Sequence, residues 1–116
     1  LITAGKGFVG ILDDKSPRED HVKAANDTLA ISKEKIMSGK YNVVILDEIN
    51  YALQLELLKL DDVLDVIRSK PPELDLVLTG NHAAKEVVEL ADLVTEMKEI
   101  QHPNKSGIKA KKGIDF

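Results

Sequence analysis

The sequence predicts an α/β fold built on a parallel sheet, and two observations favour this class. The unbroken apolar run 43–46 is too short for a buried helix and suits a strand buried on both faces of a parallel sheet. A second apolar run, 76–78, is separated from the first by segments with helical apolar spacing, and such alternation is typical of α/β proteins. With 116 residues, the chain 1–116 is expected to form a single domain with one core.

The first elements follow from capping residues and apolar spacing. Residues 1–15 mix glycine with short apolar pairs and are expected to form a strand end followed by a loop. A long helix is predicted to begin with Ser16 as its N-cap and Pro17 at its first position, and to end at Gly39. The first strand, over 42–46, follows this helix.

The later elements continue the alternation up to a polar tail over 101–116. They are, in order, a helix over 49–58, a helix capped by Asp61 and ended by Pro71-Pro72, a strand over 74–79, a helix over 84–91 and a third strand over 93–100.

Composition and charge exclude several classes of partner. The net charge of −4 and the scarcity of arginine, present only as Arg18 and Arg68, argue against nucleic-acid binding. No stretch approaches the roughly 20 apolar residues of a membrane-spanning helix, so no membrane partner is expected. The sequence contains no cysteine, which fits a reducing cytoplasm. Because Leu1 rather than a methionine opens the sequence, we expect that part of a longer protein precedes it.

The acidic pair Asp47-Glu48 is the strongest candidate for a functional site. It directly follows the first predicted strand, and open α/β sheets bind ligands at the carboxyl ends of their strands. Carboxylates placed there can hold a Mg²⁺ ion that bridges nucleotide phosphates. The structural alternative is that the pair caps the following helix, whose dipole favours negative charge at its start. No segment matches the phosphate loop G-x-x-x-x-G-K-[ST], and the nearest glycine cluster is Gly5-Lys6-Gly7.

Several segments together resemble one enzyme family. They are Gly5-Lys6-Gly7-Phe8, 41–51 (YNVVILDEINY), Pro71-Pro72, Val77-Leu78-Thr79-Gly80, 89–97 (ELADLVTEM) and 107–116 (GIKAKKGIDF). Their order and spacing are similar to the carboxy-terminal portion of the P-loop type ATP:corrinoid adenosyltransferases, which act on cob(I)alamin or cob(I)yrinic acid a,c-diamide. The resemblance implies an amino-terminally truncated, three-layer P-loop NTPase-like (RecA-like) fold, with the Walker A loop upstream of residue 1.

The resemblance implies a transferase that moves the 5′-deoxyadenosyl group of ATP to Co(I) of a reduced corrinoid. Adenosylcobalamin or a precursor forms, and tripolyphosphate is released. Because cobalt is itself the nucleophile, the protein has to orient ATP and neutralise the leaving polyphosphate with Mg²⁺ and lysine. A homodimer is expected by the same resemblance, and a corrinoid reductase is a further candidate partner.

The resemblance also assigns roles to single residues. Asp47 and Glu48 match the acidic pair of the Mg²⁺–nucleotide site, and they are the expected catalytic and metal-binding residues. Phe8 matches an aromatic residue that packs against the lower face of the corrin, although such residues more often anchor a core or loop. Gly10 stands where some relatives have Trp, which makes the apolar wedge under the corrin thinner.

Three further cofactor-binding residues are expected after the second strand, namely Thr79, Gly80 and Asn81. They stand where many relatives have Thr-Gly-Arg, so Asn81 removes a cationic group from the ligand edge of the sheet. The structural alternative is that Thr79 and Gly80 only form a strand-to-helix turn.

Two other functions remain open on the sequence. A relative without the phosphate loop would be a non-catalytic module for corrinoid binding or dimerisation that does not use ATP. An unrelated nucleotide-dependent switch or ATPase is suggested by the acidic pair alone. The unpaired strand edge of a truncated sheet also gives a physical reason to expect self-association.

Overall fold

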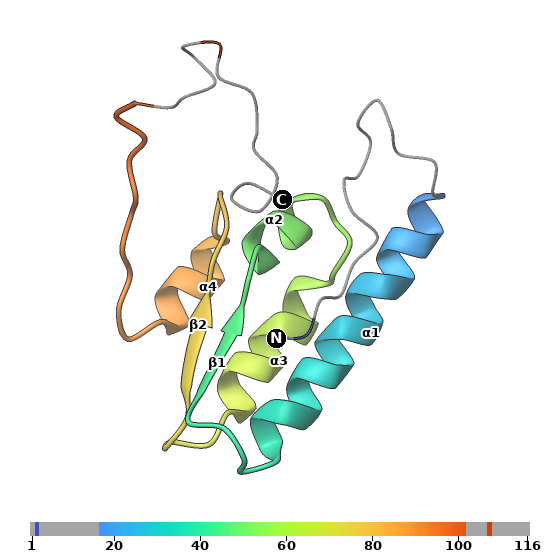
Figure 1. The fold of residues 1–116 in the computed structure, drawn as a ribbon, viewed down its shortest axis with the longest axis vertical. Helices are drawn as coiled ribbons and strands as arrows, with labels where there is room; N and C mark the ends of the chain where they lie inside the picture. Colours follow the sequence, from blue (N-terminus) through green and yellow to red (C-terminus); the bar gives the residue numbers. More distant parts are fainter. Residues whose placement is uncertain (1, 3–16, 102–106, 108–116) are drawn as a thin grey trace.

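The computed structural model describes residue 2, residues 17–101 and residue 107. These residues form six elements around one core (Figure 1): α1 (Arg18–Met37), β1 (Val43–Leu46), α2 (Ile49–Gln54), α3 (Leu60–Ser69), β2 (Asp75–Leu78) and α4 (Lys85–Leu90). The mixed α/β class predicted from the sequence is therefore confirmed. The predictions for Phe8, Gly10 and the cluster Gly5-Lys6-Gly7 lie outside the described residues.

The two strands form a parallel pair in which Val43 lies beside Asp75 and Leu46 lies beside Leu78. Parallel strands cannot be joined by a tight hairpin, and here α2 and α3 supply the crossover connection. Both strands consequently end at the same edge of the sheet. The residues that follow them along the chain are brought together there.

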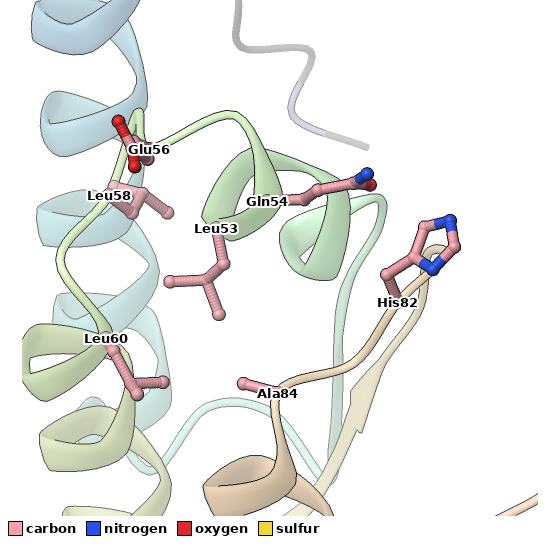
Figure 2. A pocket seen from close by; sticks show the side chains of 7 residues that line it. All are labelled: Leu53, Gln54, Glu56, Leu58, Leu60, His82 and Ala84. Carbon is pink, nitrogen blue, oxygen red and sulfur yellow. The ribbon is translucent and has the colours of Figure 1, made fainter.

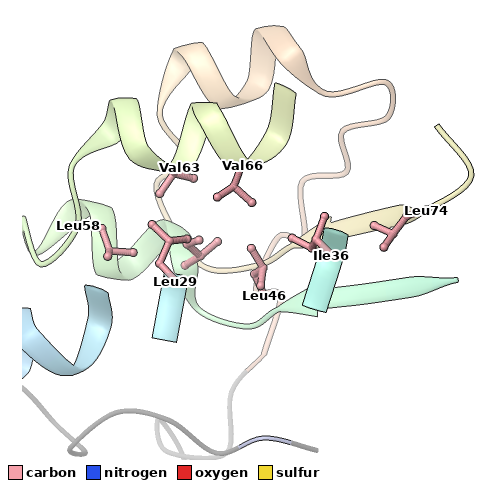
Figure 3. Close-up of a cluster of buried hydrophobic side chains, with 8 residues drawn as sticks. Leu29, Ile36, Leu46, Leu58, Val63, Val66 and Leu74 are labelled. Carbon is pink, nitrogen blue, oxygen red and sulfur yellow. The ribbon is translucent and has the colours of Figure 1, made fainter. Parts of the chain in front are cut away.

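The core lies between one face of the sheet and the helices (Figure 3). Alternate strand residues turn to this face, and the buried cluster joins them to α1 and to α3. Its members are Leu29, Ile36, Leu46, Ile49, Leu58, Val63, Val66 and Leu74. α1 thus contributes Leu29 and Ile36 to the core.

The opposite face of the sheet is apolar and exposed among the described residues. Val43, Ile45 and Val77 lie on it beside the exposed Asp75, which pairs with Val43, and Ile45 is 62% exposed. The prediction that the first strand is buried on both faces is therefore wrong for this part of the chain. The cause is that the core cluster covers only one face, so every second strand residue remains in contact with solvent.

Helix boundaries differ from the prediction where a local conformation decides them. Pro17 is the N-cap of α1 rather than its first residue, with φ −58° and ψ 145°, and Ser16 lies outside the described residues. The helix predicted over 49–58 ends at Gln54, because the chain turns through a left-handed Glu56 with φ 56°. The apolar residues beyond this turn are buried but not helical. Their spacing therefore led to the prediction of a helix that is longer than the one observed.

Asp61 does not cap α3. The N-cap of this helix is Lys59, and Asp61 lies in the first turn. An aspartate is favourable in either place, because the positive end of the helix dipole extends over the first turn. The strand predicted over 74–79 and the helix predicted over 84–91 are confirmed as β2 and α4, each within one residue at either end.

The third strand predicted over 93–100 is not formed. The segment leaves α4 without regular structure, and its apolar side chains are exposed, Met97 by 92%. In Figure 1 it runs as an orange trace beyond α4. A strand is stabilised only by pairing with a neighbour, so an apolar run without a hydrogen-bonded partner strand does not become one.

Among residues 17–101, no helix is long and apolar enough to cross a membrane. The cytoplasmic location stays a prediction.

Candidate functional site

The candidate site is built at the shared carboxyl edge of β1 and β2. Asp47 follows β1 and Thr79 follows β2, so the parallel register places them side by side. The hydroxyl group of Thr79 donates a hydrogen bond to Oδ1 of Asp47 at 2.6 Å. This distance is typical of a charge-assisted bond to an ionised carboxylate. The structure therefore brings together two of the predicted residues from segments far apart in the sequence.

Glu48 adopts a left-handed backbone conformation at this edge. Its φ of 58° and ψ of 20° are unusual for a residue with a side chain and cost on the order of 1 kcal/mol. Its backbone N–H donates to the hydroxyl oxygen of Thr79 at 2.9 Å. Glu48 is also the N-cap of α2, but its side chain makes no capping hydrogen bond. The carboxylate of Glu48 is exposed, so capping bonds do not account for the acidic pair.

Gly80 allows the turn after β2 to approach the start of α2 closely. Its φ is 114°, and a Cβ atom there would lie 3.1 Å from the backbone nitrogen of Tyr51 and 3.3 Å from Cα of Glu48. Both the conformation and the space favour glycine. Gly80 thus shapes the site through its backbone, which agrees with the structural alternative considered for it.

Asn50 belongs to this edge as well, although the sequence analysis assigned it no role. Only 5% of the residue is exposed. Its backbone N–H donates to the carbonyl oxygen of Thr79 at 3.1 Å, and its Nδ2 donates to the carbonyl oxygen of Gly80 at 3.4 Å. The side-chain oxygen Oδ1 is buried without a hydrogen-bond partner among the described residues. A polar residue at the start of an apolar helix was the only available signal.

Asn81 and His82 lie beyond this cluster. Both are exposed, and His82 has a left-handed φ of 56°. Among the described residues, no hydrogen bond joins the side chain of Asn81 to the acidic pair. Of the predicted residues that the structure describes, Thr79 is hydrogen-bonded to both Asp47 and Glu48, Gly80 lies close to Glu48, and Asn81 stands apart.

The donor set of the edge fits a hard cation that brings other ligands with it. Within the described part of the chain, no group of three or more His, Cys, Asp or Glu residues could hold a metal ion. Asp47 and Glu48 offer carboxylate oxygens, and Mg²⁺ is commonly held by one or two carboxylates together with phosphate oxygens and water. The pair therefore fits Mg²⁺ in company with a nucleotide better than a metal ion held by protein alone.

A cavity of about 340 Å³ lies near this edge but does not include the acidic pair (Figure 2). Leu53, Leu60 and Ala84 point toward one another across it, with Gln54 and His82 farther out. None of the predicted site residues that the structure describes lines this cavity. The only titratable groups that line the cavity are His82 and Glu56. The candidate site therefore lies at the carboxyl end of the strands, where the acidic pair is found, and not in the cavity.

Comparison with known proteins supports the resemblance noted in the sequence. The family model described as ATP:corrinoid adenosyltransferase BtuR/CobO/CobP matches residues 1–116. A corrinoid adenosyltransferase from a Sinorhizobium species is 38% identical over 115 residues, which are 98% of this chain and 52% of the relative.

Two further relatives give the same result. The corrinoid adenosyltransferase of Pseudomonas aeruginosa is 36% identical over 112 residues, covering 97% of this chain and 54% of the relative. That of Escherichia coli K12 is 28% identical over 107 residues, covering 92% and 55%. The chain thus spans about half the length of these curated relatives. Its family is nevertheless plain, and the chain belongs to the ATP:corrinoid adenosyltransferases of the BtuR/CobO/CobP type.

Proposed function

We propose that this chain is part of an enzyme that transfers the 5′-deoxyadenosyl group of ATP to Co(I) of a reduced corrinoid. In this reaction the electron pair of Co(I) forms the cobalt–carbon bond, and the bond between the 5′ carbon and its oxygen breaks. Tripolyphosphate leaves with that oxygen. The observation that carries the proposal is the acidic pair, which lies exposed at the carboxyl edge of the sheet in a member of this family.

In this proposal Asp47 and Glu48 hold the Mg²⁺ ion that accompanies ATP. The ion would supply positive charge to the leaving polyphosphate. Gly80 and Asn81 form the neighbouring part of the nucleotide edge, Thr79 lies between them and the acidic pair, and Phe8 packs under the corrin. The larger architecture proposed here is a three-layer P-loop NTPase-like domain. This chain would be its carboxy-terminal portion, which agrees with its match to about half the length of a curated relative.

The test is anaerobic adenosylation of reduced cobalamin by the 116-residue chain with MgATP, followed through the absorbance of Co(I). Asp47→Asn and Glu48→Gln are expected to lower turnover by a factor on the order of 100, because each removes a charged ligand oxygen of the metal. Glu73→Gln is the matched control, since Glu73 is exposed and precedes β2 at the opposite edge of the sheet. Turnover equal to wild type in both site variants would refute the proposal.

A non-catalytic module for corrinoid binding or dimerisation is the second candidate. The exposed apolar side chains of Val43, Ile45 and Val77 on the sheet favour the dimerisation form of this reading. A folded chain that forms no product and binds no MgATP would support this reading, whereas tight MgATP binding would count against it. The third reading, an unrelated ATPase or switch, does not agree with the family to which the chain belongs.

The proposed partners are ATP, a reduced corrinoid and a second copy of the chain, with a corrinoid reductase as a further candidate. The second copy is supported by the apolar sheet face formed by Val43, Ile45 and Val77. Such a face is unfavourable in water and is a common basis for association.

A further inference from the structure

Thr79 directs each of its polar groups at the segment 46–50, which runs from the last residue of β1 into the start of α2. Its backbone N–H donates to the carbonyl oxygen of Leu46 at 3.2 Å, and its carbonyl oxygen accepts from the backbone N–H of Asn50 at 3.1 Å. Its hydroxyl accepts from the N–H of Glu48 at 2.9 Å and donates to Asp47 at 2.6 Å. Thr79 therefore makes four hydrogen bonds to the segment that carries the acidic pair.

The direction of the hydroxyl hydrogen bonds follows from the chemistry of the partners. A hydroxyl group has one proton to donate, a backbone N–H can only donate, and an ionised carboxylate can only accept. The single proton of Thr79 must therefore point at Oδ1 of Asp47, while Glu48 donates to the hydroxyl oxygen. Because the proton is committed in this way, the hydroxyl of Thr79 has no donor left for a phosphate group.

We infer that Thr79 is a positioning residue, which orients Asp47 and Glu48 toward the metal and does not itself bind the nucleotide. The inference deepens the proposed function and rests on it for the identity of the metal. The hydroxyl holds one oxygen of Asp47, and no described residue bonds to the other, which stays available to a cation. The same hydroxyl holds the left-handed backbone of Glu48. Replacing a group that orients metal ligands in this way commonly lowers metal affinity by about 10- to 100-fold.

Two variants separate positioning from mere packing. Thr79→Val keeps the branched shape and removes the hydroxyl, whereas Thr79→Ser keeps the hydroxyl and removes a methyl group. Thr28→Val is the matched control, because the hydroxyl of Thr28 makes a hydrogen bond of similar length, 2.7 Å, to the carbonyl oxygen of Ala24 inside α1. All are made in the 116-residue chain, and Asp47→Asn serves as the reference for loss of a metal ligand.

The first readout is the affinity for Mn²⁺ in the presence of ATP, measured by electron paramagnetic resonance. Thr79→Val is expected to weaken Mn²⁺ binding about tenfold. Thr79→Ser and Thr28→Val are expected to bind as the wild type does. Unchanged affinity in Thr79→Val, alongside a clear loss in Asp47→Asn, would overturn the inference, as would an equal loss in Thr79→Ser.

The second readout needs no metal and separates failure of the inference from failure of the proposed function. Amide hydrogen exchange by NMR should show that the N–H of Glu48 exchanges faster in Thr79→Val and is unchanged in Thr79→Ser. The N–H of Asn50, which bonds to the backbone of Thr79, should stay protected in both variants and so report an intact fold.

Two combined outcomes are then distinct. If the wild type binds no Mn²⁺ with ATP but the exchange pattern is as expected, the metal–nucleotide function fails while the positioning of the acidic pair by Thr79 stands. If the exchange rate of Glu48 is the same in Thr79→Val as in the wild type, the positioning role is refuted whatever the metal does.

Discussion

At the residue scale, the site depends on two backbone conformations that most side chains avoid. Glu48 has φ 58° and Gly80 has φ 114°, and the two residues are packed against each other at the strand edge. Strained residues of this kind persist where surrounding contacts hold them, and they are frequent at functional sites. Here the hydroxyl of Thr79 provides such a contact for Glu48. Backbone conformation and carboxylate orientation are therefore set by the same few hydrogen bonds.

Gly80→Ala tests this view against a matched glycine. The new Cβ would meet backbone atoms of Tyr51 and Glu48 as well as an unfavourable φ, so we expect a loss of roughly 2–4 kcal/mol in the free energy of unfolding. Gly39 has a positive φ of 68°, within the left-handed region that other residues can adopt, and no atom lies within 4 Å of the new Cβ, so Gly39→Ala should cost only about 1 kcal/mol. Urea denaturation of both variants gives the comparison, and equal losses would show that close packing at Gly80 is unimportant.

At the scale of elements, β1 presents two apolar faces in very different surroundings. Leu46 faces the core together with residues of α1 and α3, while Ile45 on the other face is mostly exposed. α1 supplies the fully buried Ile36 to the same core. The two isoleucines therefore offer the same side chain in opposite environments.

The same substitution at these two isoleucines should have very different costs. Ile36→Ala leaves a cavity in the core and is expected to lower the free energy of unfolding by about 2–5 kcal/mol. Ile45→Ala should cost about 1 kcal/mol or less, chiefly through weaker strand propensity. Thermal unfolding monitored by circular dichroism measures both. A large loss at Ile45 would mean that the outer face is already covered in solution.

At the scale of the whole molecule, the described sheet has only two strands. Each strand therefore has one long side without a described partner strand, and one face of the sheet is apolar. An edge strand offers unpaired backbone groups to another chain, and an apolar face adds a driving force for association. Together these two features favour association with a second copy of the chain.

Association should therefore depend on the outer face. We expect the average mass from light scattering to rise with concentration in the wild type, and Ile45→Lys to shift the equilibrium toward the monomer by placing a charge on that face. Gln54→Lys adds the same single charge at an exposed position in α2, outside the sheet, and should leave the association unchanged. A wild-type mass that stays monomeric at high concentration would contradict the proposed homodimer.

Much of the fold and part of the site could be predicted because they depend on local patterns. The apolar runs predicted β1 and β2, and the position of Asp47 directly after β1 predicted that it lies at the carboxyl end of the parallel strands. Thr79 was expected near the ligand, but its hydrogen bonds to Asp47 and Glu48 could not be predicted, because they join residues that are 32 and 31 positions apart in the sequence. The prediction of a third strand over 93–100 was wrong for a related reason. An apolar pattern does not show whether another strand lies close enough to form hydrogen bonds with it.

The bonds between Thr79 and the end of β1 also couple ligand binding to stability. A ligand that binds Asp47 and Glu48 only when β1 and β2 are paired must favour the folded chain over the unfolded one. Its contribution grows with the logarithm of its concentration and reaches about 2.7 kcal/mol at 100 times the dissociation constant. Melting temperature is therefore a direct reporter of occupancy at this edge, and it requires neither turnover nor a known product.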